Sequence, residues 1–215
     1  MALPGSKIRI TPEEYLKFER DFLNGKHEYQ DGQLYLMAGE SVSHGRIKSN
    51  LVREIGQQLK GRNCDLFTAD MKVGVALGGP YYYPDVVIVC GQLVFRDQEK
   101  DVLLNPHTII EVLSPSTEAF DRGGKFESYQ KKEALTTYVL IAQDRPRVTV
   151  LVRQPNQHWD LSLVTELKAR VILEKLSCHV PMAEIYARVV FPPDEIEAPK
   201  TAVTRKPGKK SRKKS

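Results

Sequence analysis

Cysteine is scarce in this chain of 215 residues, which contains only Cys64, Cys90 and Cys178. An odd number of scattered cysteines argues against a disulfide framework and makes a reducing, cytoplasmic compartment the default expectation. Their spacing also matches no zinc-binding pattern, because the adjacent Cys178 and His179 alone supply too few ligands for a metal site.

Long apolar runs are missing as well. No segment approaches the roughly 20 apolar residues that a helix needs to span a bilayer. The first ten residues, MALPGSKIRI, lack the apolar region of a secretory signal. The composition, 41% hydrophobic and 27% charged, is typical of a soluble globular domain. We therefore expect a protein without a membrane partner.

Acidic residues are absent from the end of the chain after Glu197, where eight residues are basic. The rest of the chain has 24 basic and 27 acidic residues, although the whole chain carries a net charge of +5. We expect residues 1–193 to form one domain and residues 194–215 a disordered basic tail. The tail either keeps the protein soluble or contacts nucleic-acid phosphates without sequence preference. The candidate contacts are Lys209, Lys210, Arg212, Lys213 and Lys214.

The body of the chain mixes helix and strand patterns without regular alternation. Thr11-Pro12-Glu13-Glu14 predicts a helix start with a capping box. Apolar residues every fourth position from Ile47 to Leu59 predict a second helix. Apolar runs predict strands, and a segment near Pro181 is amphipathic but interrupted. The main predicted strands cover residues 86–89, 108–113, 137–142, 147–153 and, at a sheet edge, 159–164. This pattern predicts an α/β fold with a central mixed β-sheet flanked by helices.

Two of the predicted buried strands carry a carboxylate at one end. Glu111 interrupts the apolar run of residues 108–113, and Asp85 directly precedes the run of residues 86–89. If these strands are neighbours, the two carboxylates meet at one end of the sheet. Neighbouring carboxylates repel each other, and a shared proton or a hard divalent cation relieves the repulsion.

Other polar residues have ordinary explanations when each is taken alone. Asp121 and Lys125 share a helix face at spacing four, which is typical of an exposed ion pair contributing ~0.3–0.5 kcal/mol. Glu28, which precedes a predicted turn, is typical of a surface acid. His44 lies at the start of the second predicted helix, where a capping role is more common than a contact to phosphate.

Taken together and in order, these residues resemble a known pattern. The series Glu28, Pro84-Asp85, Glu111-Val112-Leu113 and Lys125 resembles the PD-(D/E)xK nuclease superfamily. The segments HEYQDGQLYLMAGES, SHGRIKSNL, YYPDVVIV, IIEVLSPST and DRGGKFESYQKK resemble the Uma-type restriction endonuclease family, over residues 11–190. The resemblance implies a restriction-endonuclease-like fold and hydrolysis of DNA phosphodiester bonds with Mg²⁺, or with Mn²⁺ in its place. A homodimer and a monomer both stay open.

The resemblance also implies roles for individual residues. Asp85 and Glu111 would bind the metal together with the backbone carbonyl of Val112. Lys125 would position or deprotonate the attacking water, and Glu28 would support the site.

The chain departs from the superfamily pattern at Leu113, which stands where the pattern has its lysine. Lys125 would reach back to that place, so we expect its ammonium group within roughly 3–5 Å of a carboxylate of Glu111 or Asp85. Replacing Lys125 by alanine is expected to reduce turnover ~10²–10⁴-fold with little change in stability. A non-catalytic nucleic-acid-binding or assembly module with the same fold is the alternative. The intact set of candidate residues favours the nuclease.

Overall fold

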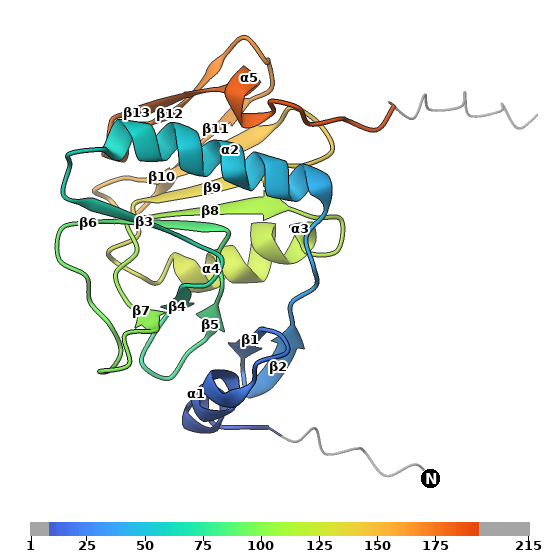
Figure 1. The fold of residues 1–215 in the computed structure, drawn as a ribbon. Helices are drawn as coiled ribbons and strands as arrows, with labels where there is room; N and C mark the ends of the chain where they lie inside the picture. The colour runs from blue at the N-terminus through green and yellow to red at the C-terminus, as the bar shows by residue number, and fades with distance from the viewer. Residues whose placement is uncertain (1–8, 194–215) are drawn as a thin grey trace, which may run out of the picture.

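The computed structural model describes residues 9–193 (Figure 1). The predicted basic tail, with Lys209, Lys210, Arg212, Lys213 and Lys214, lies outside the described residues. Within the described part of the chain, no helix combines the length and the apolar character that crossing a membrane requires.

A six-stranded sheet forms the centre of the molecule, with the strand order β11-β10-β9-β8-β6-β3. The bounds are β3 (Cys64–Thr68), β6 (Val86–Cys90), β8 (Thr108–Leu113), β9 (Thr137–Ala142), β10 (Val148–Arg153) and β11 (Trp159–Val164). β8 and β9 pair in parallel, whereas the other neighbouring strands are antiparallel. The α/β fold with a central mixed sheet is thereby confirmed, and β11 is an edge strand as predicted.

Shorter strands form two further sheets, which the sequence pattern does not distinguish from the central one. The first is five-stranded with the order β2-β1-β5-β4-β7, and the second pairs β12 with β13. The bounds are β1 (His27–Gln30), β2 (Gln33–Leu36), β4 (Lys72–Gly74), β5 (Tyr81–Tyr82), β7 (Val102–Leu103), β12 (Arg170–Leu173) and β13 (Cys178–Pro181). The amphipathic segment around Pro181 contains β12, β13, the 3₁₀ turn η2 (Glu174–Leu176) and α5 (Met182–Ile185).

Helices cover both faces of the central sheet (Figure 1). α2 (Val42–Leu59) packs on one face through its predicted apolar stripe, in which Ile47 and Ile55 are fully buried. Burying one such side chain stabilises the fold by about 1.5–3 kcal/mol. The other face is covered by α3 (Glu118–Phe120), the π-helical turn η1 (Asp121–Lys125) and α4 (Phe126–Tyr129). The central strands are therefore buried on both sides.

α1 (Pro12–Asp21) packs beside the five-stranded sheet (Figure 1). Thr11 and Glu14 form the predicted capping box at its start. Arg20 near its end pairs with Asp97 at 2.9 Å and with Asp101 at 2.8 Å. Asp101 also pairs with the buried Lys72 at 3.0 Å, so this carboxylate links α1 to β4.

The expectation that the cysteines form no disulfide is wrong for two of them. Cys64 and Cys90 are directly opposite each other in the antiparallel register of β3 and β6, and their sulfur atoms are bonded. Cys178 is a free, buried cysteine. Count and spacing along the chain did not reveal the pairing, because strand register brings together residues that are 26 positions apart.

Candidate active site

The carboxylates of Asp85 and Glu111 come together because of the pairing of two core strands. β6 and β8 are antiparallel with Val86 opposite Ile110, so the residue before β6 lies beside the end of β8. The backbone N–H of Asp85 points to Glu111 Oε2 at 3.4 Å. The backbone N–H of Val112 donates to Asp85 Oδ2 at 2.8 Å. Asp85, Glu111 and Val112 therefore lie together at one end of the central sheet.

Lys125 lies among three carboxylates. Its Nζ atom is 3.0 Å from Glu111 Oε1 and 2.9 Å from Glu28 Oε1. A third carboxylate, that of Asp121, is 3.6 Å away. The expected distance between Lys125 and Glu111 is confirmed. Because Asp121 and Lys125 are only 3% and 5% exposed, the interpretation of this pair as a surface ion pair is wrong.

A π-helical turn brings Lys125 and Asp121 into this position. The turn η1 lies between α3 and α4 and contains both residues. Such turns are wider than an α-helical turn and occur often at functional sites. A methyl group at Gly124 would lie 3.1 Å from a ring carbon of Phe120, so glycine keeps this turn free of a close contact.

Glu28 links the five-stranded sheet to the turn η1 at the site. It lies on β1 of the five-stranded sheet, and its Oε1 atom accepts a hydrogen bond from the backbone N–H of Tyr83 at 3.0 Å. The same oxygen pairs with Lys125. Its side chain is 13% exposed, so the interpretation of Glu28 as a surface acid is wrong.

The buried charges shift one another's ionisation. Burial raises the pKa of Glu111 well above its usual value; Lys125 opposes this shift, whereas Asp121, Asp85 and Glu28 add to it. Burial also raises the pKa of Asp121. Burial alone would lower the pKa of Lys125, but Glu111 and Glu28 outweigh it and raise that pKa. Carboxyl groups outnumber ammonium groups here, so a bound cation would favour the ionised forms of these carboxyl groups.

The donor atoms at this end of the sheet suit a hard divalent cation. Such cations prefer carboxylate and carbonyl oxygens, which Asp85, Glu111 and Val112 supply. Glu111 Oε1 accepts no hydrogen bond of good geometry, although Lys125 is close to it. The residues present therefore fit a metal.

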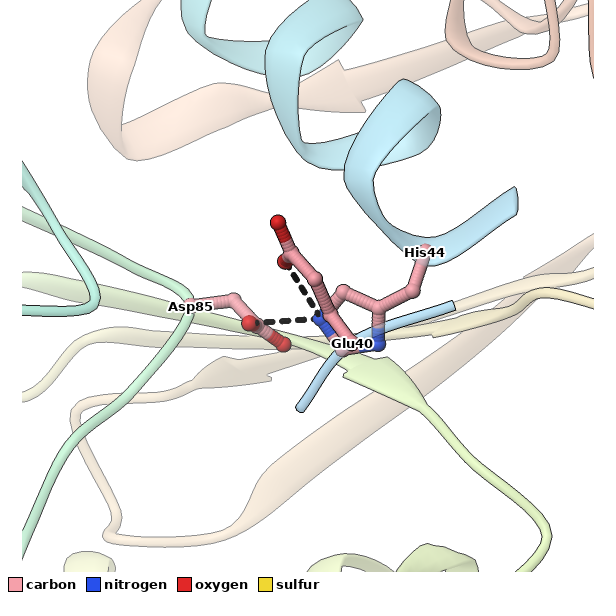
Figure 2. Close-up of side chains that lie close together, drawn as sticks. All are labelled: Glu40, His44 and Asp85. Carbon is pink, nitrogen blue, oxygen red and sulfur yellow. Dashed lines mark hydrogen bonds and ion pairs between the residues drawn. The ribbon is translucent and has the colours of Figure 1, made fainter. Parts of the chain in front are cut away.

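Two further polar residues reach Asp85 from the start of α2 (Figure 2). His44 Nε2 is 2.7 Å from Asp85 Oδ1, and Glu40 Oε2 is 3.8 Å from the same nitrogen. The helix cap is Ser41, whose Oγ atom accepts from the backbone N–H of His44 at 3.1 Å. The interpretation of His44 as a capping residue is therefore wrong. The spacing of four between Glu40 and His44 is the sequence signal that could have indicated a shared site.

Comparisons with known proteins found two relatives in Synechocystis sp.. The chain is 33% identical over 184 residues to "Uncharacterized protein slr1290" of Synechocystis sp., covering 85% of this chain and 94% of that protein. It is 34% identical over 167 residues to "Uncharacterized protein sll1609" of the same organism, covering 78% of this chain and 92% of that protein.

A solved structure has the same fold. It is the crystal structure of "a putative nuclease belonging to DUF820" from Anabaena variabilis, with a TM-score of 0.69 and 20% identity, covering 84% of this chain and 99% of that one. The model of the Uma2 family, described as "Putative restriction endonuclease", matches residues 12–180. Since the match covers most of the chain, this protein belongs to the Uma2 family.

Proposed function

We propose that this protein is a metal-dependent endonuclease that hydrolyses phosphodiester bonds of DNA. The observation that carries the proposal is the buried cluster of Lys125 with Glu28, Glu111 and Asp121 beside Asp85. Keeping several carboxylates out of water is costly unless a cation compensates their charge. Such a cluster at an end of the sheet does not help the protein to fold, so its presence favours a functional role.

The residues divide into two groups by what they contact. Asp85 and Glu111, with the carbonyl of Val112, would hold Mg²⁺ or Mn²⁺, which when bound neutralises charge on a phosphate and lowers the pKa of a coordinated water. Lys125 would stabilise the negative charge that develops on the phosphoryl oxygens. Glu28 and Asp121 contact Lys125 and would hold its ammonium group in place.

The environment of Lys125 favours an electrostatic role over a role as base. An ammonium group that is paired with two carboxylates at 2.9 and 3.0 Å keeps its proton, and a protonated amine has no lone pair to accept another. The family resemblance implied that Lys125 positions or deprotonates the attacking water. We therefore assign it the positioning role, and we add the stabilisation of charge on the phosphoryl oxygens. We further propose that the basic residues of the tail add contacts to DNA phosphates.

The test is cleavage of supercoiled plasmid by the full chain with Mg²⁺, with Mn²⁺ and with EDTA. The informative variant is Asp85→Asn, which keeps the size of the side chain and removes its charge. The matched control is Asp160→Asn, which changes an exposed residue of β11. We expect nicked and linear products only with a metal, loss of cleavage in Asp85→Asn and full cleavage in Asp160→Asn.

Two outcomes would contradict the proposal. Cleavage that continues in EDTA, or that Asp85→Asn leaves intact, would exclude this site as its source. A plasmid that stays uncut with both metals, while the protein still retards DNA in a gel, would favour the non-catalytic nucleic-acid-binding module.

A further inference from the structure

We infer that His44 is a nitrogen ligand of the divalent cation that Asp85 binds, with Glu40 as an additional carboxylate ligand; this inference rests on the proposed function. The three residues each offer one ligand atom, and these atoms lie within 4.8 Å of one another. Ligands at ~2.1 Å from a cation are about 3.0 Å apart when adjacent in an octahedron and about 4.2 Å apart when opposite. The separations of 2.7 and 3.8 Å from His44 Nε2 are close to that range.

The two oxygens of Asp85 face different surroundings, which indicates where the cation would bind. Oδ2 accepts the hydrogen bond from the backbone of Val112, whereas Oδ1 faces His44. Lys125 lies against Glu111 Oε1, whereas Glu111 Oε2 lies beside the backbone N–H of Asp85 and is left for the cation. The side of Asp85 that remains for a cation is the one to which His44 and Glu40 point (Figure 2).

His44 is held firmly enough to act as a ligand. It lies in the first turn of α2, and Ser41 Oγ binds its backbone N–H. Its helix is anchored in the core by Ile47, which follows one turn later. The side chains of His44 and Asp85 are only 13% and 14% exposed. Glu40 is less fixed, since its side chain is 44% exposed and contacts Lys48.

An imidazole nitrogen changes the choice of metal. Mg²⁺ prefers oxygen ligands, whereas transition metals accept imidazole readily. A site with His44 should therefore bind Mn²⁺ more tightly than Mg²⁺. A site built from Asp85 and Glu111 alone would offer only oxygen ligands and would discriminate less between Mn²⁺ and Mg²⁺.

The experiment measures metal binding directly, without reference to cleavage. The full chain is stripped with EDTA, dialysed and titrated with Mn²⁺, and free Mn²⁺ is measured by electron paramagnetic resonance. Pulsed measurements then detect a coupled ¹⁴N nucleus at the bound ion. The variants are His44→Gln and Asp85→Asn, and the matched control is His158→Gln, which replaces an exposed histidine of the β10–β11 connection.

We expect the unaltered protein and His158→Gln to bind Mn²⁺ with a coupled nitrogen. His44→Gln should lose the nitrogen coupling and weaken Mn²⁺ binding at least about 10-fold, since even residues that only orient a ligand have effects of this size. It should also narrow the preference for Mn²⁺ over Mg²⁺ in competition titrations. Asp85→Asn should abolish binding.

The possible failures are distinguishable. Mn²⁺ bound without nitrogen coupling, or bound as tightly by His44→Gln, overturns the role of His44 and leaves the proposed function standing if Asp85→Asn still abolishes binding. Unchanged binding in Asp85→Asn overturns both the inference and the proposed metal site. The same holds if the unaltered protein binds no Mn²⁺.

Discussion

The charge balance around Lys125 can be tested by replacing that residue with methionine, which has a similar length and no charge. The side chain of Lys125 is 6% exposed and pairs with Glu28, Glu111 and Asp121. Removing one partner from a buried ion pair costs about 3–5 kcal/mol, because the remaining charge stays buried without compensation. The sequence alone predicted that loss of Lys125 would have little effect on stability. Because Lys125 is buried, we expect a substantial loss of stability in its place.

This cost is large compared with the stability of a typical domain, which is about 5–15 kcal/mol. For a domain of this size the melting temperature should fall by about 6–20 °C. The assay is urea unfolding and thermal melting of the metal-free full chain in EDTA at pH 7. The matched control is Lys131→Met, which removes an exposed lysine two residues beyond α4 and should change stability by less than about 0.5 kcal/mol.

A double variant separates charge balance from packing. Adding Glu111→Gln to Lys125→Met removes one of the uncompensated carboxylates and should recover about 0.5–3 kcal/mol of the loss. A Lys125→Met protein as stable as the Lys131→Met control would refute the reasoning. So would a double variant whose losses simply add, because the two charges would then not depend on each other.

Two more predictions concern the scaffold of the site. Burial alone would raise the pKa of Asp101, but hydrogen bonds from Arg20 and Lys72 outweigh it and lower the pKa from 3.8 to about 2. A carboxylate with a depressed pKa stabilises the fold above pH ~4, and this contribution disappears as the pH falls toward 2. Asp101→Asn should therefore be roughly 2 kcal/mol less stable than the unaltered protein at pH 7. In urea titrations this difference in stability should shrink below pH 4. A difference that is constant with pH would contradict the lowered pKa of Asp101. Cys64→Ser opens a loop whose ends are 26 residues apart and should cost about 3.5 kcal/mol by loop entropy. A thiol assay of the unfolded, unreduced chain should find one free cysteine, and three would disprove the disulfide.

Much of the fold could be predicted from local patterns in the sequence. The strands β6, β8 and β9 are mostly apolar because they are buried on both faces, and such runs are visible without a structure. The capping box of α1 is equally local, since it involves residues only three positions apart. Two strands of the second sheet were harder to assign, because β5 and β7 have two residues each and carry no periodic signal.

The candidate site was predicted less completely than the fold. Asp85 and Glu111 were recognisable, since each interrupts or precedes an apolar run. The burial of Asp121 and Glu28 was not, because it depends on which sheet and which helix cover them. The disulfide and the contact of His44 with Asp85 depend in the same way on register and on the direction of α2.

The burial of β8 on both faces explains why the lysine of the site is Lys125 and does not stand at position 113. Alternate residues of a strand point to opposite faces, and Ile109 and Leu113 pack on the face that Tyr129 of α4 covers. Glu111, between them at the same spacing, points to that face, where Leu113 is 2% exposed in a packed apolar cluster.

A lysine at position 113 would have to place its stem in that cluster, whereas the helical segment lying on the same face can direct Lys125 at Glu111 from the side. His44 reaches the site from α2 on the opposite face, past the end of the sheet. The cation that we propose at Asp85 would thus be approached from both faces. For this reason, substitutions in α2 and in the helical segment that carries Lys125, which lie on opposite faces of the sheet, should affect binding of the same metal ion.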